Sequence, residues 1–325
     1  MAKKARKVET NLRHVDHEIP GTGIIMQRRA ERHPLAPEKR PFVFPEDQVR
    51  DVAVAWKLGM NVMLTGPTGC GKTALPRAIC AELGEPLIRF NCDGETRVSN
   101  LRGMNVPAAK DGVLTLQFSP GDLAICMREG YKVLLDEIDA ALPSVRFVLQ
   151  PVLEEDSRTL HIPETSETIV AAEGFGVFAT GNTVGYRASS RAQHAGTMNM
   201  NAAFLDRFGM VIACDYPSRP EEFQRIQVNV PECDPEVIEG ICRVAEDLRS
   251  DEKFKADFST RRCIQWARLM VEYPFKEILR ASELAVVRKL EFPTDARVAR
   301  EIIARKFSYP VPGEPPARLR YSDDR

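Results

Sequence analysis

The sequence predicts an α/β domain built on a parallel sheet, followed by a smaller all-helical domain. Between residues 46 and 216, short apolar strands alternate with helical patterns, which is the order expected of a parallel sheet covered by helices. The strand at 131–136 (YKVLLD) is apolar almost throughout, as a strand buried on both faces is. No strand pattern remains after residue 219. A helical domain is therefore expected at 217–308.

Residues 1–45 are polar and contain five prolines, so we expect an extended leader that wraps the domain or is partly disordered. A helix follows at 46–59, where Val49, Val52 and Trp56 recur at helical spacing. In chain order, the other strands of the domain are expected at 61–65, 86–92, 175–180 and 210–215, and its other helices at 73–83, 95–102, 121–129, 143–155 and 199–207.

Two β-hairpins are expected inside the α/β domain, at about 104–121 and 157–172, the first turning at Asp111-Gly112. A long polar loop, 183–198, precedes the last helix, and loops of that length inside compact domains are usually functional. The helical domain is predicted to contain helices at 219–229, 235–250, 260–271, 275–290 and 294–306, before an extended, Pro-rich tail at 309–325.

Bulk composition excludes several classes of protein. A net charge of −1 gives no general attraction to nucleic acid or to membranes, and no apolar run is long enough to span a bilayer. The 8 cysteines show no C-x-x-C spacing, and several lie in apolar runs. That pattern is typical of reduced, buried thiols, so we expect a cytoplasmic protein without a disulfide framework or a zinc site.

The stretch GPTGCGKT at 66–73 fits the pattern G-x-x-x-x-G-K-[ST] and lies between a predicted strand and a predicted helix. Its glycines let backbone N–H groups point at a phosphate. Lys72 would place a positive charge on the β- and γ-phosphates, and Thr73 would offer its hydroxyl to Mg²⁺. The predicted phosphate-binding residues are Gly66, Pro67, Thr68, Gly69, Cys70, Gly71, Lys72 and Thr73.

Carboxylates follow the apolar strand at 131–136. Asp136 ends that strand, at the edge of the sheet where ligands of parallel α/β proteins bind, and is the second candidate for holding Mg²⁺. Glu137 comes next and could polarise an attacking water as a general base.

Three further polar residues are candidates on position alone. Asn182 follows the strand at 175–180, where it could orient water or contact the γ-phosphate, although a turn-forming asparagine fits the same place. Phosphoryl transfer also needs positive charge, for which Arg207 in FLDRF and Arg261 at the start of a helix are candidates.

The ordered set GPTGCGKT, LLDEID, FATGN and NAAFLDRF, followed by a helical domain with STRR, resembles the AAA+ ATPases. The two hairpins are similar to those of the helix-2-insert group, which includes the MoxR-type ATPases and the chelatase ATPase subunits. Residues 136–160 and 178–208 resemble the CobS-type ATPase subunits of cobaltochelatases, and the likeness covers about 46–275.

The resemblance implies a role for each motif. Residues 66–73 correspond to Walker A, Asp136 and Glu137 to Walker B, and Asn182 to sensor 1. Arg207 corresponds to an arginine finger that acts on the neighbouring subunit's ATP. Arg261 corresponds to sensor 2, with the adjacent Arg262 as the alternative, and Asn91 to the polar residue that restrains the catalytic glutamate.

Family likeness also implies a P-loop αβα sandwich with a helical lid, binding ATP and Mg²⁺ in a homo-oligomer, a hexameric ring. Such a motor would remodel or activate a partner complex, and a protein with a von Willebrand A (VWA) domain, CobT-like, is the expected partner. Two alternatives stay open: the ATPase subunit of a cobaltochelatase, and a nucleic-acid-linked motor. Near-zero net charge and the lack of a basic aromatic stripe weigh against a nucleic-acid partner.

Overall fold

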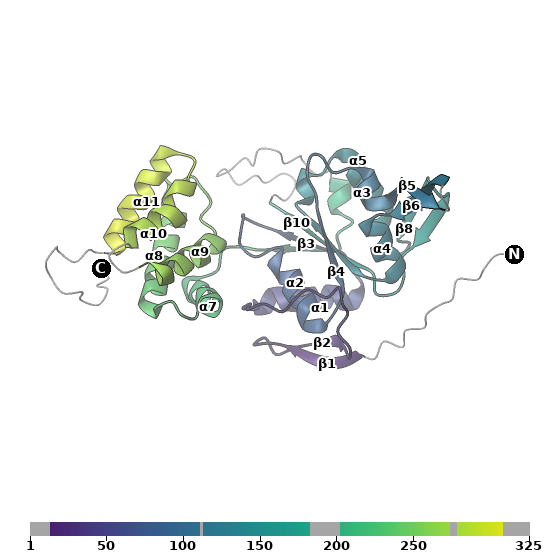
Figure 1. Cartoon of the computed structure of the whole chain (residues 1–325). Coiled ribbons are helices and arrows are strands. Elements are labelled where there is room, and N and C mark those ends of the chain that lie inside the picture. The colour runs from purple at the N-terminus through teal and green to yellow at the C-terminus, as the bar shows by residue number, and fades with distance from the viewer. Residues whose placement is uncertain (1–13, 111–112, 183–201, 274–277, 308–325) are drawn as a thin grey trace.

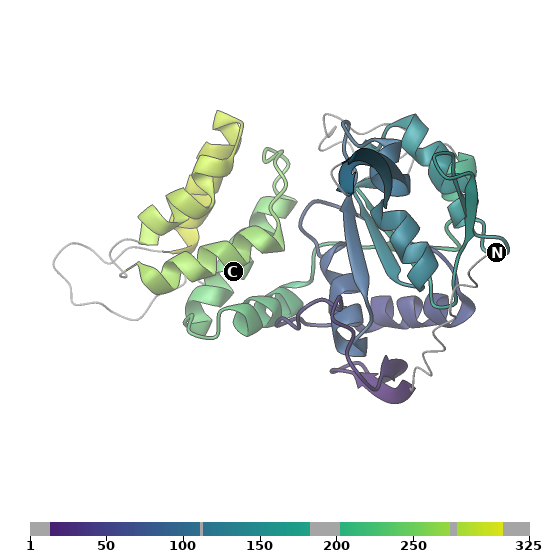
Figure 2. The ribbon, with the colours of Figure 1, turned by 45° about the vertical axis from the view of Figure 1, so that its right-hand side comes forward.

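The computed structural model describes residues 14–110, 113–182, 202–273 and 278–307. It consists of an α/β lobe and a helical lobe, which lie side by side in both ribbon views (Figures 1 and 2). Within the described residues, no helix combines the length and apolar character needed to cross a bilayer.

The α/β lobe is built on a five-stranded sheet in which every neighbouring pair is parallel. From one edge to the other, its strands are β11 (Met210–Ala213), β3 (Val62–Thr65), β10 (Gly176–Gly181), β7 (Lys132–Asp136) and β4 (Leu87–Asn91). The strand of this sheet that comes first in the chain, β3, thus lies between the two that come last, β10 and β11. This confirms the predicted parallel α/β fold.

Both faces of the sheet are covered, because successive side chains of each strand point to opposite faces and the strands carry apolar side chains on both. On β7, Leu134 packs on one face, and Val133 and Leu135 pack on the other. Helices α1 (Glu46–Leu58) and α2 (Ala74–Leu83) cover the Leu134 face. The opposite face is covered by α3 (Val98–Arg102), α4 (Asp122–Glu129), α5 (Pro143–Leu153) and α6 (Ala202–Leu205).

Both predicted hairpins are present. The first pairs β5 (Gly103–Lys110) with β6 (Val113–Pro120), and the second pairs β8 (Thr159–Ile162) with β9 (Glu167–Val170). The Asp111-Gly112 turn and the loop at 183–198 lie outside the described residues. A short 3₁₀ helix, η1 (Ile138–Ala140), follows β7.

The leader differs from the expected extended chain. Its residues form an antiparallel hairpin of β1 (His14–Ile19) and β2 (Ile24–Arg29). The turn places Gly21 and Gly23 at φ of 75° and 67°, a conformation that glycine adopts without steric cost. Arg29 forms an ion pair with Glu85, and the rings of His14 and His17 lie against Glu85 and Glu82, which fixes the hairpin to the end of α2.

The helical lobe follows β11. Its helices are α7 (Arg219–Asn229), α8 (Pro235–Ser250), α9 (Thr260–Glu272), α10 (Ile278–Ala285), the 3₁₀ helix η3 (Val287–Lys289) and α11 (Pro293–Lys306). The single helix expected at 275–290 is therefore divided, since Val286 has φ −117° and ψ −68°. The tail at 309–325 lies outside the described residues.

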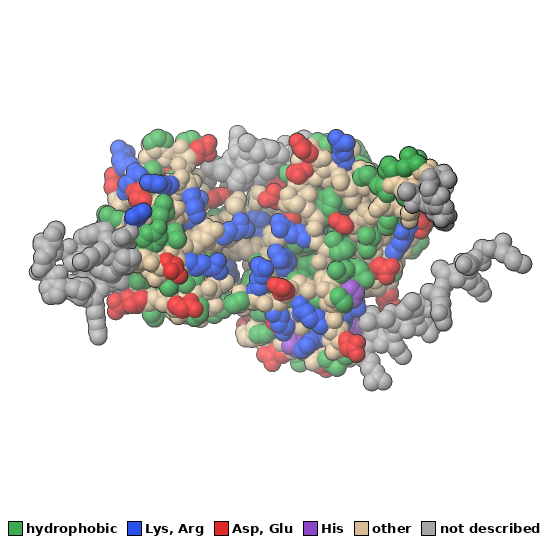
Figure 3. Space-filling model, viewed as in Figure 1, with side chains coloured by type: hydrophobic (Ala, Val, Ile, Leu, Met, Phe, Trp, Pro, Cys, Tyr) green, Lys and Arg blue, Asp and Glu red, His purple; other side chains and the backbone are tan. Residues whose placement is uncertain are grey.

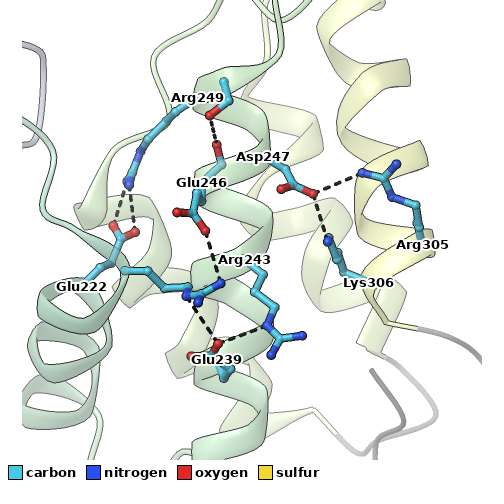
Figure 4. A network of polar contacts seen from close by, with 10 residues as sticks. Glu222, Glu239, Arg243, Glu246, Asp247, Arg249, Arg305 and Lys306 are labelled. Carbon is cyan, nitrogen blue, oxygen red and sulfur yellow. Dashed lines mark hydrogen bonds and ion pairs between the residues drawn. The ribbon is translucent and has the colours of Figure 1, made fainter. Parts of the chain in front are cut away.

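A buried ion pair links the helices of this lobe. Arg249 on α8 donates two hydrogen bonds, of 2.8 and 2.7 Å, to the carboxylate of Glu222 on α7 (Figure 4). The hydroxyl of Thr260, at the start of α9, donates to the same carboxylate at 2.9 Å. Glu222 is 1% exposed, so its charge depends on these partners.

We predict that Arg249→Met lowers the free energy of unfolding by about 3–5 kcal/mol, because the Glu222 carboxylate stays buried without its counter-charge. Denaturant unfolding measures the loss, and the double variant Glu222→Gln/Arg249→Met should recover most of it. As a control, Arg297→Ala removes an exposed pair with Glu301 and should cost less than about 1 kcal/mol. Equal losses for Arg249→Met and Arg297→Ala would contradict the role of the buried pair.

Candidate functional site

The loop 66–73 leaves β3 and enters α2 as the sequence predicts. Gly66, Gly69 and Gly71 have φ of 148°, 73° and 119°, which only glycine adopts without strain. A Cβ on Gly66 would lie 1.9 Å from the carbonyl oxygen of Cys214, the residue after β11. The tight curvature of the loop therefore depends on glycine at this position.

Lys72 is buried, and its ammonium group joins the loop to the neighbouring strand. It donates to the carbonyl oxygens of Gly66 and Pro67 at 2.7 and 2.8 Å, and to Oδ1 of Asn182 at 2.9 Å. The backbone N–H of Asn182 donates to Oδ2 of the buried Asp139 at 2.8 Å. Asn182 thus directs its side chain at Lys72, which a role in turn formation alone does not require.

Asp136 is the centre of a second set of contacts. Its carboxylate accepts hydrogen bonds from the hydroxyls of Thr73, at 2.9 Å, and Thr180. Arg89 on β4 contacts Oδ2 with Nε at 2.8 Å and with a terminal nitrogen at 2.5 Å. Sheet order explains the arrangement, since β10 and β4 flank β7.

Glu137 follows Asp136 and has the positive φ of 57°, unusual for a residue with a side chain. Its backbone N–H donates to the hydroxyl of Thr180 at 2.9 Å, which holds this conformation, and the residue is exposed. Asn91 is paired in register with Asp136 across β4 and β7, so it lies beside the start of this turn. Both residues are available to a ligand at the edge of the sheet.

The residues present fit a magnesium ion. The Thr73 hydroxyl and the Asp136 carboxylate lie within 2.9 Å of each other and supply oxygen ligands, which Mg²⁺ prefers. In the part of the chain that the structure describes, no three His, Cys, Asp or Glu side chains gather as a metal cage. Mg²⁺ commonly relies on one or two protein oxygens, completed by phosphate and water.

The helical lobe places Arg261 next to the loop. A Cβ on Gly69 would lie 2.5 Å from Cβ of Ser259 and 3.7 Å from Cβ of Arg261, so the start of α9 packs directly on the loop. Arg261 is exposed there. Arg262 instead lies over the ring of Phe258 at 5.6 Å, and burial lowers the pKa of its guanidinium. The structure brings Arg261, rather than Arg262, to the phosphate-binding loop.

Three residues at the site were missed by sequence reasoning. Arg225 on α7 donates to the carbonyl oxygen of Cys70 at 3.3 Å, and burial lowers the pKa of its guanidinium. Thr180 and Arg89 hold Asp136. Arg89 precedes Asn91 by two residues on one strand and therefore shares its face, so the sequence could have indicated that Arg89 lies near the site.

On the face shown in Figure 3, Lys and Arg side chains gather where the two lobes meet.

Arg207 is the one predicted site residue that lies far from the loop. Its carbonyl oxygen accepts a hydrogen bond at 3.0 Å from the side chain of Asn61, the residue before β3, whereas the loop begins after β3. Five residue steps of extended chain, from Asn61 to Gly66, separate these points by about 16 Å. Its guanidinium donates to Glu154 at 2.8 Å and to the carbonyl oxygen of Ala203 at 2.5 Å.

Comparisons with known proteins identify the family of this chain. The family model of an AAA domain of the dynein-related subfamily matches residues 61–208. An uncharacterised protein of Staphylococcus haemolyticus is 30% identical over 275 residues, which are 83% of this chain and 99% of that protein. The aerobic cobaltochelatase subunit CobS of a Sinorhizobium species is 30% identical over 234 residues, 70% of each chain.

Among solved structures, the RuvB Holliday junction branch migration motor of Thermotoga maritima aligns with a TM-score of 0.48. The alignment covers 81% of this chain and 75% of that chain at 16% identity. The TM-score and the sequence identity are both too low to indicate a shared function.

We predict that Gly66→Ala destabilises the protein by about 3 kcal/mol or more, because the new methyl group overlaps the Cys214 carbonyl oxygen and the φ of 148° is strained. Gly59→Ala is the matched control: its φ is 69°, but nothing lies within 4 Å of the added Cβ, so the cost should be about 1 kcal/mol. Denaturant unfolding of both variants tests the close approach. Similar costs for the two variants would show that Gly66 does not approach the Cys214 carbonyl oxygen closely.

Proposed function

Since this chain belongs to the MoxR/CobS-like AAA+ ATPases, we propose that it is the ATP-hydrolysing subunit of a ring that remodels or activates a partner protein complex. The observation that supports a ring is the position of Arg207, at the opposite end of β3 from its own phosphate-binding loop. Lys72, Asn182 and Asp136 meet at the other end.

In this proposal the loop 66–73 holds the phosphates of ATP by its backbone N–H groups. Lys72 places its charge on the β- and γ-phosphates, while Thr73 and Asp136 would hold Mg²⁺, largely through water. Bound Mg²⁺ supplies positive charge that offsets the charge of the phosphate oxygens. The contacts of Lys72 with carbonyl oxygens keep its ammonium group over the loop.

Hydrolysis follows from the positions of Glu137 and Asn182. Glu137 takes a proton from water as the water oxygen attacks the γ-phosphorus, and the bond from that phosphorus to the bridging oxygen of ADP breaks. Asn182 orients the water or the γ-phosphate from beside Lys72. Asn91, next to the same turn, restrains Glu137 until the site is complete.

Positive charge for the transition state comes from two directions. Arg261 on α9 approaches from the lid of the same subunit, next to Gly69. Arg207 acts in trans, on the ATP of the neighbouring subunit. Placing ATP at each subunit interface in this way leads us to propose a hexamer, acting in the cytoplasm, where the eight buried, free cysteines would stay reduced.

A mixing experiment tests the site shared between subunits. Arg207→Ala alone should bind ATP and assemble normally but hydrolyse about a thousandfold more slowly. Glu137→Gln alone should also be inactive. Mixed in equal amounts, the two variants should regain about a quarter of wild-type activity, because a Glu137 site then meets an Arg207 finger at about one interface in four.

Steady-state ATP hydrolysis measures the recovery, and Arg128→Ala serves as the control for loss of a partly exposed arginine paired with a glutamate. No recovery on mixing, with intact assembly and ATP binding, would exclude a finger acting in trans. Unchanged hydrolysis by Arg207→Ala would remove Arg207 from the site.

The β5–β6 hairpin is the surface that we propose for contact with the partner. Leu114 and Leu116 on β6 are 79% and 72% exposed and share one face of the strand. A VWA-domain protein, CobT-like, is the proposed partner. The alternative of a cobaltochelatase subunit draws support from the similarity to CobS, which covers 70% of that protein.

We predict that the tagged protein, purified from its own cells with ATP present, carries a VWA-domain protein and that Leu116→Asp loses it while basal ATP hydrolysis is retained. Val170→Asp, on the exposed part of β9, is the matched control and should keep the partner. Corrin-processing subunits in the purified complex would favour the cobaltochelatase alternative. Stimulation of hydrolysis by DNA would favour a nucleic-acid motor instead.

A further inference from the structure

The two oxygens of the Asp136 carboxylate have different partners. Oδ1 accepts hydrogen bonds from the hydroxyl of Thr73, at 2.9 Å, and from the hydroxyl of Thr180. Oδ2 faces Arg89, whose Nε and one terminal nitrogen lie 2.8 and 2.5 Å away. The carboxylate is therefore held in one orientation, because a partial turn would break contacts with both of its oxygens.

Arg89 reaches this carboxylate from the neighbouring strand. It lies on β4, two residues before Asn91, which is paired in register with Asp136. The Arg89 side chain is 47% exposed, whereas Asp136 is buried. Ordering a long, largely exposed arginine costs conformational entropy. Two charge-assisted hydrogen bonds to one carboxylate oxygen offset that cost and fix the guanidinium at the edge of the site.

Arg89 is also the main source of positive charge for this acid. Among the described residues, it is the only Lys or Arg side chain that forms an ion pair with Asp136. The cation of the phosphate-binding loop, Lys72, donates instead to two carbonyl oxygens of the loop and to Asn182. Lys72 and Asp136 thus belong to separate sets of contacts, and the orientation of Asp136 depends on Arg89.

We propose that Arg89 is a positioning residue for Mg²⁺ binding, which orients the Asp136 carboxylate so that Oδ1 stays beside the Thr73 hydroxyl. These two oxygen groups are the ones that fit the ion. Side chains that orient metal ligands commonly change metal affinity by about 10–100-fold. The role of Arg89 rests on the nucleotide site proposed above, since Mg²⁺ would be held there together with the phosphates of ATP.

The charge of Arg89, taken alone, has the opposite effect on Mg²⁺ binding. A guanidinium close to the carboxylate repels a second cation, so its removal would strengthen Mg²⁺ binding if charge alone mattered. If Arg89 acts by orienting Asp136, its removal weakens Mg²⁺ binding even though the site becomes more negative. The sign of the change therefore separates the two roles.

The test compares two affinities of the full-length protein for a fluorescent, non-hydrolysable ATP analogue, one in excess Mg²⁺ and one in EDTA. Their ratio measures how strongly Mg²⁺ supports nucleotide binding, and it requires no turnover. Arg89→Met should lower this ratio by about tenfold or more, while the affinity in EDTA stays within about twofold of the wild type. An unchanged or larger ratio overturns the proposal.

Arg89→Lys keeps the positive charge but replaces the planar fork by one ammonium group on a flexible chain. It should fold as the wild type does and lower the ratio by at least about threefold. A wild-type ratio would show that the fork is not needed to orient Asp136, and would overturn the proposal. Arg89→Lys decides alone if Arg89→Met, which leaves a buried carboxylate without its counter-charge, does not fold.

Arg29→Met is the matched control. Nε of Arg29 lies 2.9 Å from the carboxylate of Glu85, a buried acid just beyond the end of α2 that is remote from the loop. Its loss also takes an ion-pair partner from a buried acid, so Arg29→Met should be less stable but should keep the wild-type ratio. A ratio as low as that of Arg89→Met would attribute the effect to lost stability and contradict the proposal.

Failure of the proposed function gives different results. A wild-type protein that binds the ATP analogue in neither condition would exclude the nucleotide site, and the role of Arg89 would fall with it. Binding that Mg²⁺ does not strengthen would exclude the magnesium site in the same way. If Mg²⁺ strengthens binding equally in the wild type and in both Arg89 variants, only the role of Arg89 is contradicted.

Discussion

The carboxylate of Asp136 is the group on which the arrangement of the site depends. It is 3% exposed, and an unpaired charge buried to that extent would cost several kcal/mol. Thr73, Thr180 and Arg89 compensate it from the start of α2, from β10 and from β4. These segments meet only if β7 lies between β10 and β4. The hydrogen bonds and the ion pair that stabilise the buried Asp136 charge therefore require this order of strands.

A second line of contacts joins the phosphate-binding loop to the helical lobe. The hydroxyl of Tyr216 donates to the carbonyl oxygen of Thr68 at 3.1 Å, and the guanidinium of Arg249 lies over the Tyr216 ring at 4.2 Å. Arg249 in turn holds Glu222, which accepts a hydrogen bond from Thr260, immediately before Arg261. The buried ion pair of the helical lobe is thus two contacts away from the loop, and its Glu222 also contacts the residue before Arg261.

The parallel sheet and the loop could be predicted from the sequence because both are local signals: apolar runs of strand length and a glycine pattern with fixed spacing. The hairpin of the leader could not, since the side chains that hold it in place, Glu82 and Glu85, lie far along the chain. Arg225 was hidden among many arginines, because only the packing of the lobes brings it to Cys70. Sequence also favoured Arg261 but left the adjacent Arg262 as an alternative. They differ by one step around α9, and the packing of Ser259 against Gly69 decides which faces the loop.

The separation of Arg207 from the loop has a consequence for symmetry. A contact in which one protomer's Arg207 end meets another's loop end joins two different surfaces, so it is heterologous and cannot be satisfied by a two-fold dimer. Each protomer added in this way would again present its Arg207 surface at one side and its loop at the other. Such a chain of subunits ends only by closing on itself, and otherwise it grows as a helical filament. The length of β3, four residues, keeps the two surfaces apart.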